Sequence, residues 1–190
     1  YGSSALNGVV NIRTAFASYE PKTSINLTSG IYDNPKRDAI KWWNTSSPFY
    51  SGVRFSHAQK FGNADLVLGA NAYSETGYQE NNEEQRMRVN MNFRYRSRKI
   101  EGLSSGINFN YMDRTGSQFL LWLDGNAGVW QANPTFQQSY HNTSFNLYPY
   151  ITYFPNQNTK HSLKTRLYSI HNKNNTGQNN IDDTYFAEYQ

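Results

Sequence analysis

The sequence lacks cysteine, has few charged residues and contains no long apolar run. Without cysteine among its 190 residues, it offers no disulfide framework, no thiolate metal site and no cysteine nucleophile. Charged residues make up 17% of the chain, below the roughly 25% of an average soluble domain. The longest uninterrupted apolar run covers residues 119–123. A membrane-spanning helix needs about 20 such residues, so the sequence excludes transmembrane helices.

Aromatic residues, in contrast, are abundant. They make up 16% of the chain, and the net charge is only +4. Disordered chains typically combine few aromatic residues with a high net charge, so the composition argues against disorder. The chain begins at Tyr1 without a targeting sequence and ends on a strand-like stretch, residues 184–190. We therefore expect it to be an internal fragment of a longer protein.

Apolar and polar residues alternate without a break over residues 85–96. A period of two is typical of a β-strand with one apolar and one polar face. Residues 103–114, 145–153 and 163–168 repeat the pattern, and residues 23–31, 49–59 and 65–75 show weaker versions. The polar row of the two clearest strands comprises Arg86, Arg88, Asn90, Asn92, Arg94, Asn108 and Asn110.

The connections between these strands alternate between short and long. Residues 61–64, 97–102 and 155–160 are short and turn-like, whereas residues 32–48, 76–84, 115–142 and 172–183 are longer and polar. Strands of about 9 to 11 residues with short turns at one end and long loops at the other are typical of transmembrane β-barrels. The predicted fold is therefore all-β, an antiparallel up-and-down meander of about eight strands from such a barrel. Its apolar rows would face lipid and its polar row the lumen.

Aromatic positions agree with the two girdles that such barrels carry at the membrane interfaces. Phe61, Tyr95, Tyr153 and Phe154 fall at short-turn ends. The long-loop ends carry Tyr32, Phe49, Tyr73, Tyr111 and Tyr168.

The first residues, YGSSALNGVVNIRT (1–14), do not fit the meander. They resemble the end of the plug domain of TonB-dependent outer-membrane receptors, which typically closes with Y-G-x-x-A-x-x-G-x-[IV]-N-[IV]-x-T. Residues 146–153 and 161–166 are similar to barrel segments of such receptors from the Bacteroidetes. The resemblance covers essentially the whole chain. It implies that residues 1–20 are the C-terminal end of the plug domain and residues 21–190 the first eight or so strands of a barrel that has 22 strands in whole members.

The same resemblance implies a function. Such receptors take up a scarce or bulky nutrient, such as a metal chelate, a vitamin or a glycan, across the outer membrane of a Gram-negative bacterium. The implied partners are outer-membrane lipid, the extracellular nutrient, a surface lipoprotein, and the TonB energy-coupling complex, which binds through an N-terminal part that this sequence lacks. No bond is made or broken, so the resemblance implies neither an enzyme nor a cofactor.

The sequence shows no pattern typical of a catalytic or metal-binding site. The four histidines, His57, His141, His161 and His171, lack the spacing that a metal site requires. No phosphate-binding loop, nucleophile elbow or catalytic Ser/His/Asp order is visible. The arginines of residues 86–96 could suggest nucleic acid, but apolar residues alternate with them, which favours a lumen-facing row. We therefore predict no catalytic residues, no metal site and no nucleic-acid partner.

The long connections carry aromatic residues that are candidates for ligand binding, because aromatic faces stack on sugar rings and on apolar or chelate groups. The alternative is that they pack loop against loop or anchor the outer interface. The candidates are Trp42, Trp43, Phe119, Trp122, Trp130 and Tyr140.

A second fold and function also fit the composition. A soluble carbohydrate-binding β-sandwich of a secreted protein would be similarly rich in aromatic residues and asparagine. Its strands would bury their apolar face against a second sheet, and its loops would need no regular alternation of length.

Overall fold

The computed structural model describes residues 17–190, which form eight β-strands and three short 3-10 helices. Residues 1–16, most of the stretch that the sequence assigns to the end of a plug, lie outside the described residues. No helix in the described part is long and apolar enough to cross a membrane. The strands are β1 (Lys22–Ile31), β2 (Phe49–Phe61), β3 (Ala64–Glu75), β4 (Glu84–Arg96), β5 (Leu103–Gln118), β6 (Gln138–Asn156), β7 (Thr159–Asn174) and β8 (Asn180–Tyr189). The helices are η1 (Asp38–Ile40), η2 (Ala127–Trp130) and η3 (Pro134–Phe136).

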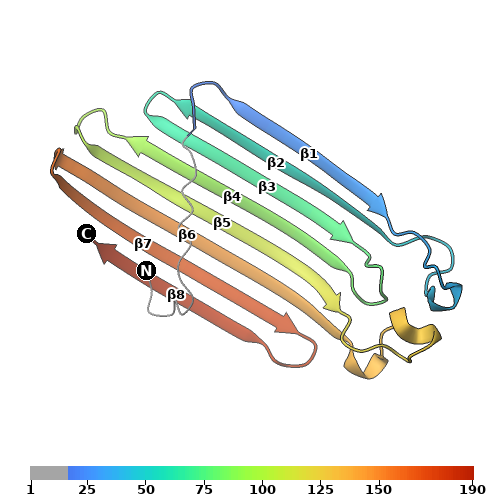
Figure 1. Cartoon of the computed structure of the whole chain (residues 1–190). Coiled ribbons are helices and arrows are strands. Elements are labelled where there is room, and N and C mark those ends of the chain that lie inside the picture. Colours follow the sequence, from blue (N-terminus) through green and yellow to red (C-terminus); the bar gives the residue numbers. More distant parts are fainter. Residues whose placement is uncertain (1–16) are drawn as a thin grey trace.

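The strands form one antiparallel sheet in which each strand pairs with the next along the chain, in the order β1 to β8 (Figure 1). This confirms the predicted all-β meander of eight strands. Within the described residues β1 and β8 each pair on one side only, so the sheet is open at both edges.

Connections of unequal length lie at opposite ends of the sheet, as the sequence predicts. Residues 62–63, 97–102 and 157–158 make the short turns, and Gly62 and Gly102 adopt the positive φ values, 55° and 77°, that glycine tolerates best. The long connections and all three helices gather at the other end (Figure 1).

Strands β5, β6 and β7 are longer than their alternation predicts, at 16, 19 and 16 residues. The predicted boundaries of two long connections are therefore wrong: the first covers residues 119–137 rather than 115–142, and the second residues 175–179 rather than 172–183. The ladder continues through polar pairs such as Arg114 with Asn142 and Gly116 with Tyr140. Backbone pairing needs no apolar alternation, so the sequence pattern ends before the strand does. Tyr140 accordingly lies in β6 and not in a loop.

The strand register sorts the side chains onto two faces, because residues directly opposite each other point to the same side. Asn90 lies opposite Asn110, and Met91 opposite Phe109. We call the face with Asn90 and Asn110 the polar face and the other the apolar face. Of the charged side chains in the eight strands, only three lie on the apolar face: Asp113, Lys173 and Asp183.

The apolar face has no second layer of described residues upon it. Leu27 and Tyr185 on this face are 79% and 76% exposed. The buried hydrophobic residues of the described chain, Trp43 and Ala132, lie in loops. Unlike a two-layer domain, this sheet therefore has no hydrophobic core of its own.

Glycine and tyrosine pair repeatedly across neighbouring strands of the polar face. Gly52 lies opposite Tyr73, and Gly106 opposite Tyr150. A Cβ atom at Gly106 would come within 2.5 Å of the Tyr150 ring, so the missing side chain makes room for the ring. Such glycines let a sheet bend while a neighbouring aromatic ring covers the gap.

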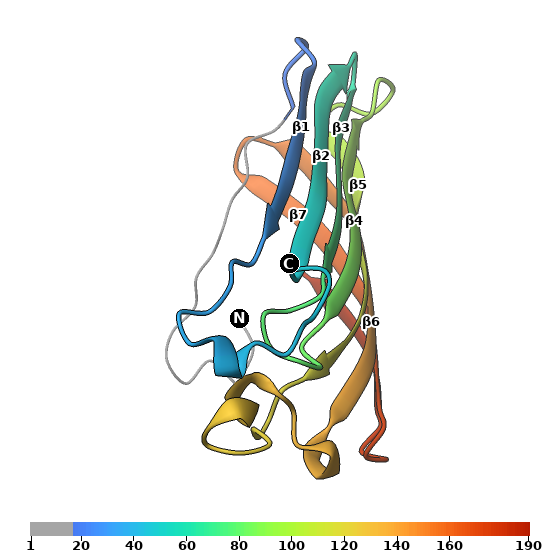
Figure 2. The same ribbon diagram turned by 90° about the vertical axis from the view of Figure 1, so that its right-hand side faces the viewer.

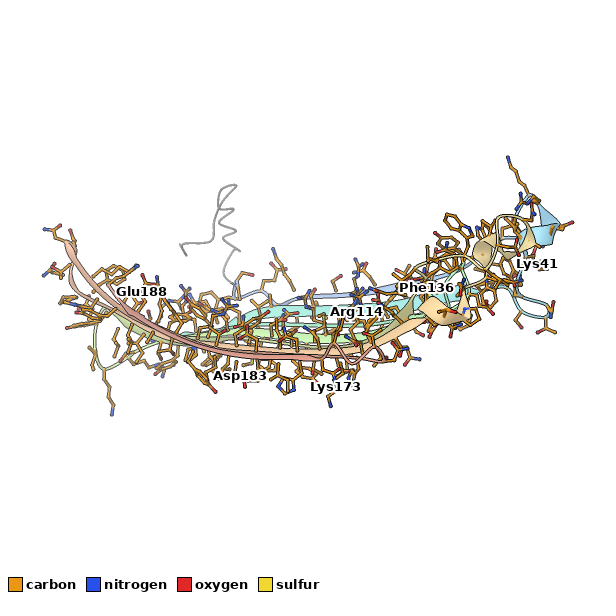
Figure 3. The ribbon with its side chains drawn as sticks, turned by 90° about the horizontal axis from the view of Figure 1, so that it is seen from below. Lys41, Arg114, Phe136, Lys173, Asp183 and Glu188 are labelled. Carbon is orange, nitrogen blue, oxygen red and sulfur yellow. The ribbon has the colours of Figure 1, made fainter. Side chains whose placement is uncertain are left out.

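The sheet is bent, as Figures 2 and 3 show. Seen edge-on, it curves toward the side on which Arg114 and Glu188 lie, whereas Lys173 and Asp183 lie on the opposite side (Figure 3). By register Arg114 and Glu188 belong to the polar face. The polar face is therefore the concave one and the apolar face the convex one.

Candidate functional site

Three loops meet at one end of the sheet, where they approach the polar face (Figure 2). We call them loop 1 (residues 32–48), loop 2 (76–83) and loop 3 (119–137). The Trp42 indole N–H donates to the Tyr78 carbonyl at 2.9 Å, which joins loop 1 to loop 2. The Glu80 amide donates to the Trp130 carbonyl at 2.9 Å, which joins loop 2 to loop 3. The Arg37 guanidinium donates to the Asn126 carbonyl, so loop 1 also contacts loop 3.

Aromatic rings from all three loops pack together, and we call them the aromatic cluster: Trp42, Trp43, Tyr78 and Trp130. Trp43 stacks on Trp130, with ring centroids 6.3 Å apart and planes 12° apart. Trp42 meets Trp43 edge-on at 5.8 Å, and Tyr78 meets Trp130 in the same way at 5.8 Å. Because Trp43 is only 6% exposed, a ligand could reach its ring only after the loops separate.

The other three predicted ligand-binding residues lie elsewhere. Trp122 is 55% exposed, within a run of exposed apolar residues that covers residues 120–123. Its backbone pairs with Ala132 inside loop 3, so an ordered miniature hairpin carries this exposed ring. Phe119 directly follows β5 and is half-buried. Tyr140 lies on the polar face, and its ring centroid is 4.9 Å from the guanidinium carbon of Arg114.

The six residues thus do not form one site. Three pack together at the junction of the loops, one is presented to solvent, and two lie near the ends of β5 and β6. Their role in ligand binding stays a prediction.

A tyrosine–glutamate network on the polar face joins the start of loop 1 to β3. The Glu75 carboxylate accepts hydrogen bonds from Tyr32 and, at 2.7 Å, from Tyr73. Burial, together with the hydrogen bond to the Glu75 carboxylate, raises the pKa of Tyr32 above its ordinary value. This network holds the start of loop 1 against β3.

Two carboxylates on the polar face each bind two arginines. Asp65, only 3% exposed, pairs with Arg94 and Arg96, each at 2.6 Å, near the short turns. Near the long loops, Glu84 pairs with Arg86 at 3.1 Å and with Arg114 at 2.6 Å. The alternation identifies these arginines but misses both carboxylates, because their partners become visible only with the strand register.

All seven residues predicted to line a lumen lie on the polar face. Asn90 is opposite Asn110 and Asn92 opposite Asn108, so the four amides form a block across β4 and β5. Arg86, Arg88 and Arg94 extend the same row along β4. Whether this face borders a lumen stays a prediction.

The polar face is hollowed over strands β1 to β4, toward their long-loop ends. The hollow measures about 380 Å³, and its lining combines cationic, anionic and amide groups. Among its lining residues are Arg54, Asn71, Tyr73, Glu75, Glu84 and Arg86.

Within residues 17–190 no group of three or more His, Cys, Asp or Glu side chains is placed to hold a metal ion. His141 pairs with Asp113 at 2.8 Å on the convex, apolar face, away from the hollow. Comparison of the chain with models of known protein families, with curated proteins and with solved structures gives no match.

Proposed function

We propose that this chain is part of a TonB-dependent outer-membrane receptor, in which the sheet forms one arc of a transmembrane barrel. The observation that supports the proposal is the segregation of charge between the two faces of the sheet. Charged side chains in the strands are confined to the polar face except for Asp113, Lys173 and Asp183. These three exceptions lie toward the long-loop end of their strands.

The apolar face has the height that a bilayer requires. Its apolar rows cover residues 87–95 of β4, 103–111 of β5, where Ser105 is the one small polar residue, and 145–153 of β6. Nine residues extend about 27 Å along a strand, and tilted membrane strands have about 9 to 11 residues. The rows lie side by side, since Met91, Phe109, Leu147 and Leu167 are successive partners in the register. Together they form a continuous band suited to lipid.

The polar face is unsuited to lipid. At the bilayer midplane an arginine costs about 2 to 4 kcal/mol, and β4 alone carries Arg86, Arg88, Arg94 and Arg96 on this face. A one-residue shift in register would exchange the two faces, so the charge pattern fixes the register. In the proposed barrel this face borders a water-filled lumen.

The open edges also fit part of a barrel. Every backbone N–H and C=O within a bilayer must be paired, so a spanning sheet has to close on itself. In the proposal, further strands beyond β8 complete a barrel of 22 strands, and residues 1–20 end a plug inside it.

Aromatic residues border the band at the short-turn end, where Phe61, Tyr95 and Tyr153 lie on the apolar face. At the long-loop end the predicted girdle is wrong for Tyr73 and Tyr168, because both lie on the polar face. Tyr111 does lie on the apolar face there. The support from girdles is therefore stronger at the short-turn end.

The proposed function is energy-coupled uptake of a scarce or bulky nutrient across the outer membrane of a Gram-negative bacterium. Loops 1, 2 and 3 would lie outside the cell, with the exposed Trp122 available to a ligand or to a surface lipoprotein. TonB would act from the periplasm through the N-terminal part of the protein. A carbohydrate-binding sandwich would instead cover the apolar face with a second sheet, which residues 17–190 do not supply.

The test uses the full-length protein in a Gram-negative host. We expect it to fractionate with the outer membrane and, after extraction in detergent, to be captured by the purified periplasmic domain of TonB. Met91→Arg should prevent assembly in the membrane, whereas the neighbouring Asn92→Arg should assemble. Recovery as a soluble monomer without detergent would contradict the proposal and favour the sandwich.

A further inference from the structure

Two arginines of the polar face have no partner among residues 17–190. Seven arginines lie in the strands, and five of them contact a described side chain. Four bind Asp65 or Glu84, and Arg166 donates to the Asn146 side-chain oxygen at 3.1 Å. The guanidinium groups of Arg54 and Arg88 make no hydrogen bond, ion pair or ring contact with any described residue, and both side chains are exposed.

The carboxylates nearest to these two arginines already have partners. Glu75 accepts from Tyr32 and Tyr73, and Glu84 binds two other arginines. Both carboxylates lie four residues along the strand from the row of Arg54 and Arg88, which corresponds to about 13 Å. Residues 1–16 contain no aspartate or glutamate, so they cannot neutralise the pair either.

Arg54 and Arg88 belong to one row across three strands. Arg54 of β2 lies opposite Asn71 of β3, and Asn71 lies opposite Arg88 of β4. Two strand spacings, about 9.5 Å, separate the backbones of the two arginines. The Asn71 side-chain nitrogen donates to the Val53 carbonyl at 3.2 Å, which holds the amide in place between them. The hollow of about 380 Å³ borders Arg54 and Asn71.

We propose that Arg54, Asn71 and Arg88 form a binding site for an oxyanion, a carboxylate or phosphate group carried by a solute. A guanidinium group presents its N–H donors in a planar fork that matches both kinds of group, and charge-assisted hydrogen bonds of this type are the stronger ones. Two such forks on either side of one amide supply convergent donors to a single anion. By register the row lies on the polar face, which is the concave side of the sheet.

The site is made of side chains from the sheet alone. It therefore stands whether or not the apolar face contacts lipid. If the proposed receptor function is correct, the site lies on the lumen wall and would recognise nutrients that carry an anionic group.

The probe for the test is inorganic phosphate, titrated calorimetrically into the purified full-length protein at pH 7.5, with chloride used to keep the ionic strength constant. We expect binding, and Arg54→Gln and Arg88→Gln should each weaken it by about tenfold or more, the fold-change that corresponds to the loss of one charge-assisted hydrogen bond. Arg88→Lys, which keeps the charge but not the fork, should fall between wild type and Arg88→Gln. Arg98→Gln, the same change in a short turn at the far end of the sheet, should leave the affinity unchanged.

A second measurement does not depend on calorimetry. Phosphate should raise the unfolding temperature of the wild type, and this increase should be reduced in both glutamine variants and kept in Arg98→Gln. The proposal is overturned if the wild type binds no phosphate. It is equally overturned if the three glutamine variants lose affinity to the same extent, because binding would then follow net charge alone.

Discussion

Replacing Trp43 by alanine should release the three loops from one another without disturbing the sheet. Trp43 is 6% exposed and provides the stacked contact with Trp130 and the edge contact with Trp42. The ammonium group of Lys41 lies 5.8 Å from its ring centroid. The strands make none of these contacts, so the damage should stay at the loop end.

The magnitude follows from these contacts. Truncating a buried tryptophan to alanine costs about 3 to 5 kcal/mol, and the lower end suits a site in surface loops that can relax. Trp122 offers a matched control, because it lies in the same group of loops but is 55% exposed. Its truncation should cost about 1 kcal/mol or less. Trp43→Phe should also cost little, since the buried indole nitrogen of Trp43 has no hydrogen-bond partner among the described residues.

Hydrogen exchange of the Glu80 amide, which donates to the Trp130 carbonyl, measures this opening. A loss of about 3 kcal/mol corresponds to exchange faster by about a hundredfold in Trp43→Ala. Amides of β4 and β5 should be unaffected. If the Glu80 amide exchanged at the wild-type rate in Trp43→Ala, or if Trp122→Ala accelerated it equally, the aromatic cluster would not be what holds the loops together.

Three further predictions concern the sheet and the start of loop 1. Asp65→Asn should lower the free energy of unfolding by about 3 kcal/mol, because it leaves two arginines without their carboxylate. Arg96→Gln should lower it by about 1 kcal/mol or less, since the Arg96 side chain is 36% exposed. Denaturant unfolding of the full-length protein, followed by fluorescence, measures both changes. Gly106→Ala should cost about 1 to 3 kcal/mol in the same assay, because the new Cβ atom would approach the Tyr150 ring and a backbone oxygen of β4 within 2.6 Å; a stability equal to wild type would disprove the close packing. The raised pKa of Tyr32 means that its protonated form stabilises the fold, so this contribution is complete below pH 10 and is lost as the pH rises toward the raised pKa. Tyr32→Phe should therefore lose less stability than the wild type between pH 10 and pH 11. Equal losses would contradict the role of Glu75.

The sheet could be predicted from the sequence because each strand carries its own signal. Residues such as Met91 and Asn92 alternate with the period of a strand, and glycine marks the turns. The signal ends where the apolar band ends, which is why the continuations of β5, β6 and β7 were not predicted. There the backbone ladder extends through residues that are polar on both faces, such as Asp113 and Arg114.

The contacts of the candidate site could not be predicted from the sequence, because they join residues that are distant in the sequence. Nothing local indicates that Trp43 stacks on Trp130 or that Glu84 binds Arg114. Both contacts require the register and the course of the loops. The same limit applies to Arg54 and Arg88, because their lack of partners within the described part of the chain appears only when the carboxylates there have been placed.

The central claim, that the apolar face contacts lipid and the polar face water, is tested most directly by cysteine labelling at two positions that are neighbours in sequence. The single variants Met91→Cys and Asn92→Cys place a thiol on the apolar and the polar face of β4, respectively, and these 190 residues contain no other cysteine. In the full-length protein in outer membranes, a membrane-impermeant thiol reagent should label Cys at position 92 and leave position 91 unlabelled, while a lipid-soluble reagent should label position 91. Equal labelling of both positions by the impermeant reagent would contradict the account.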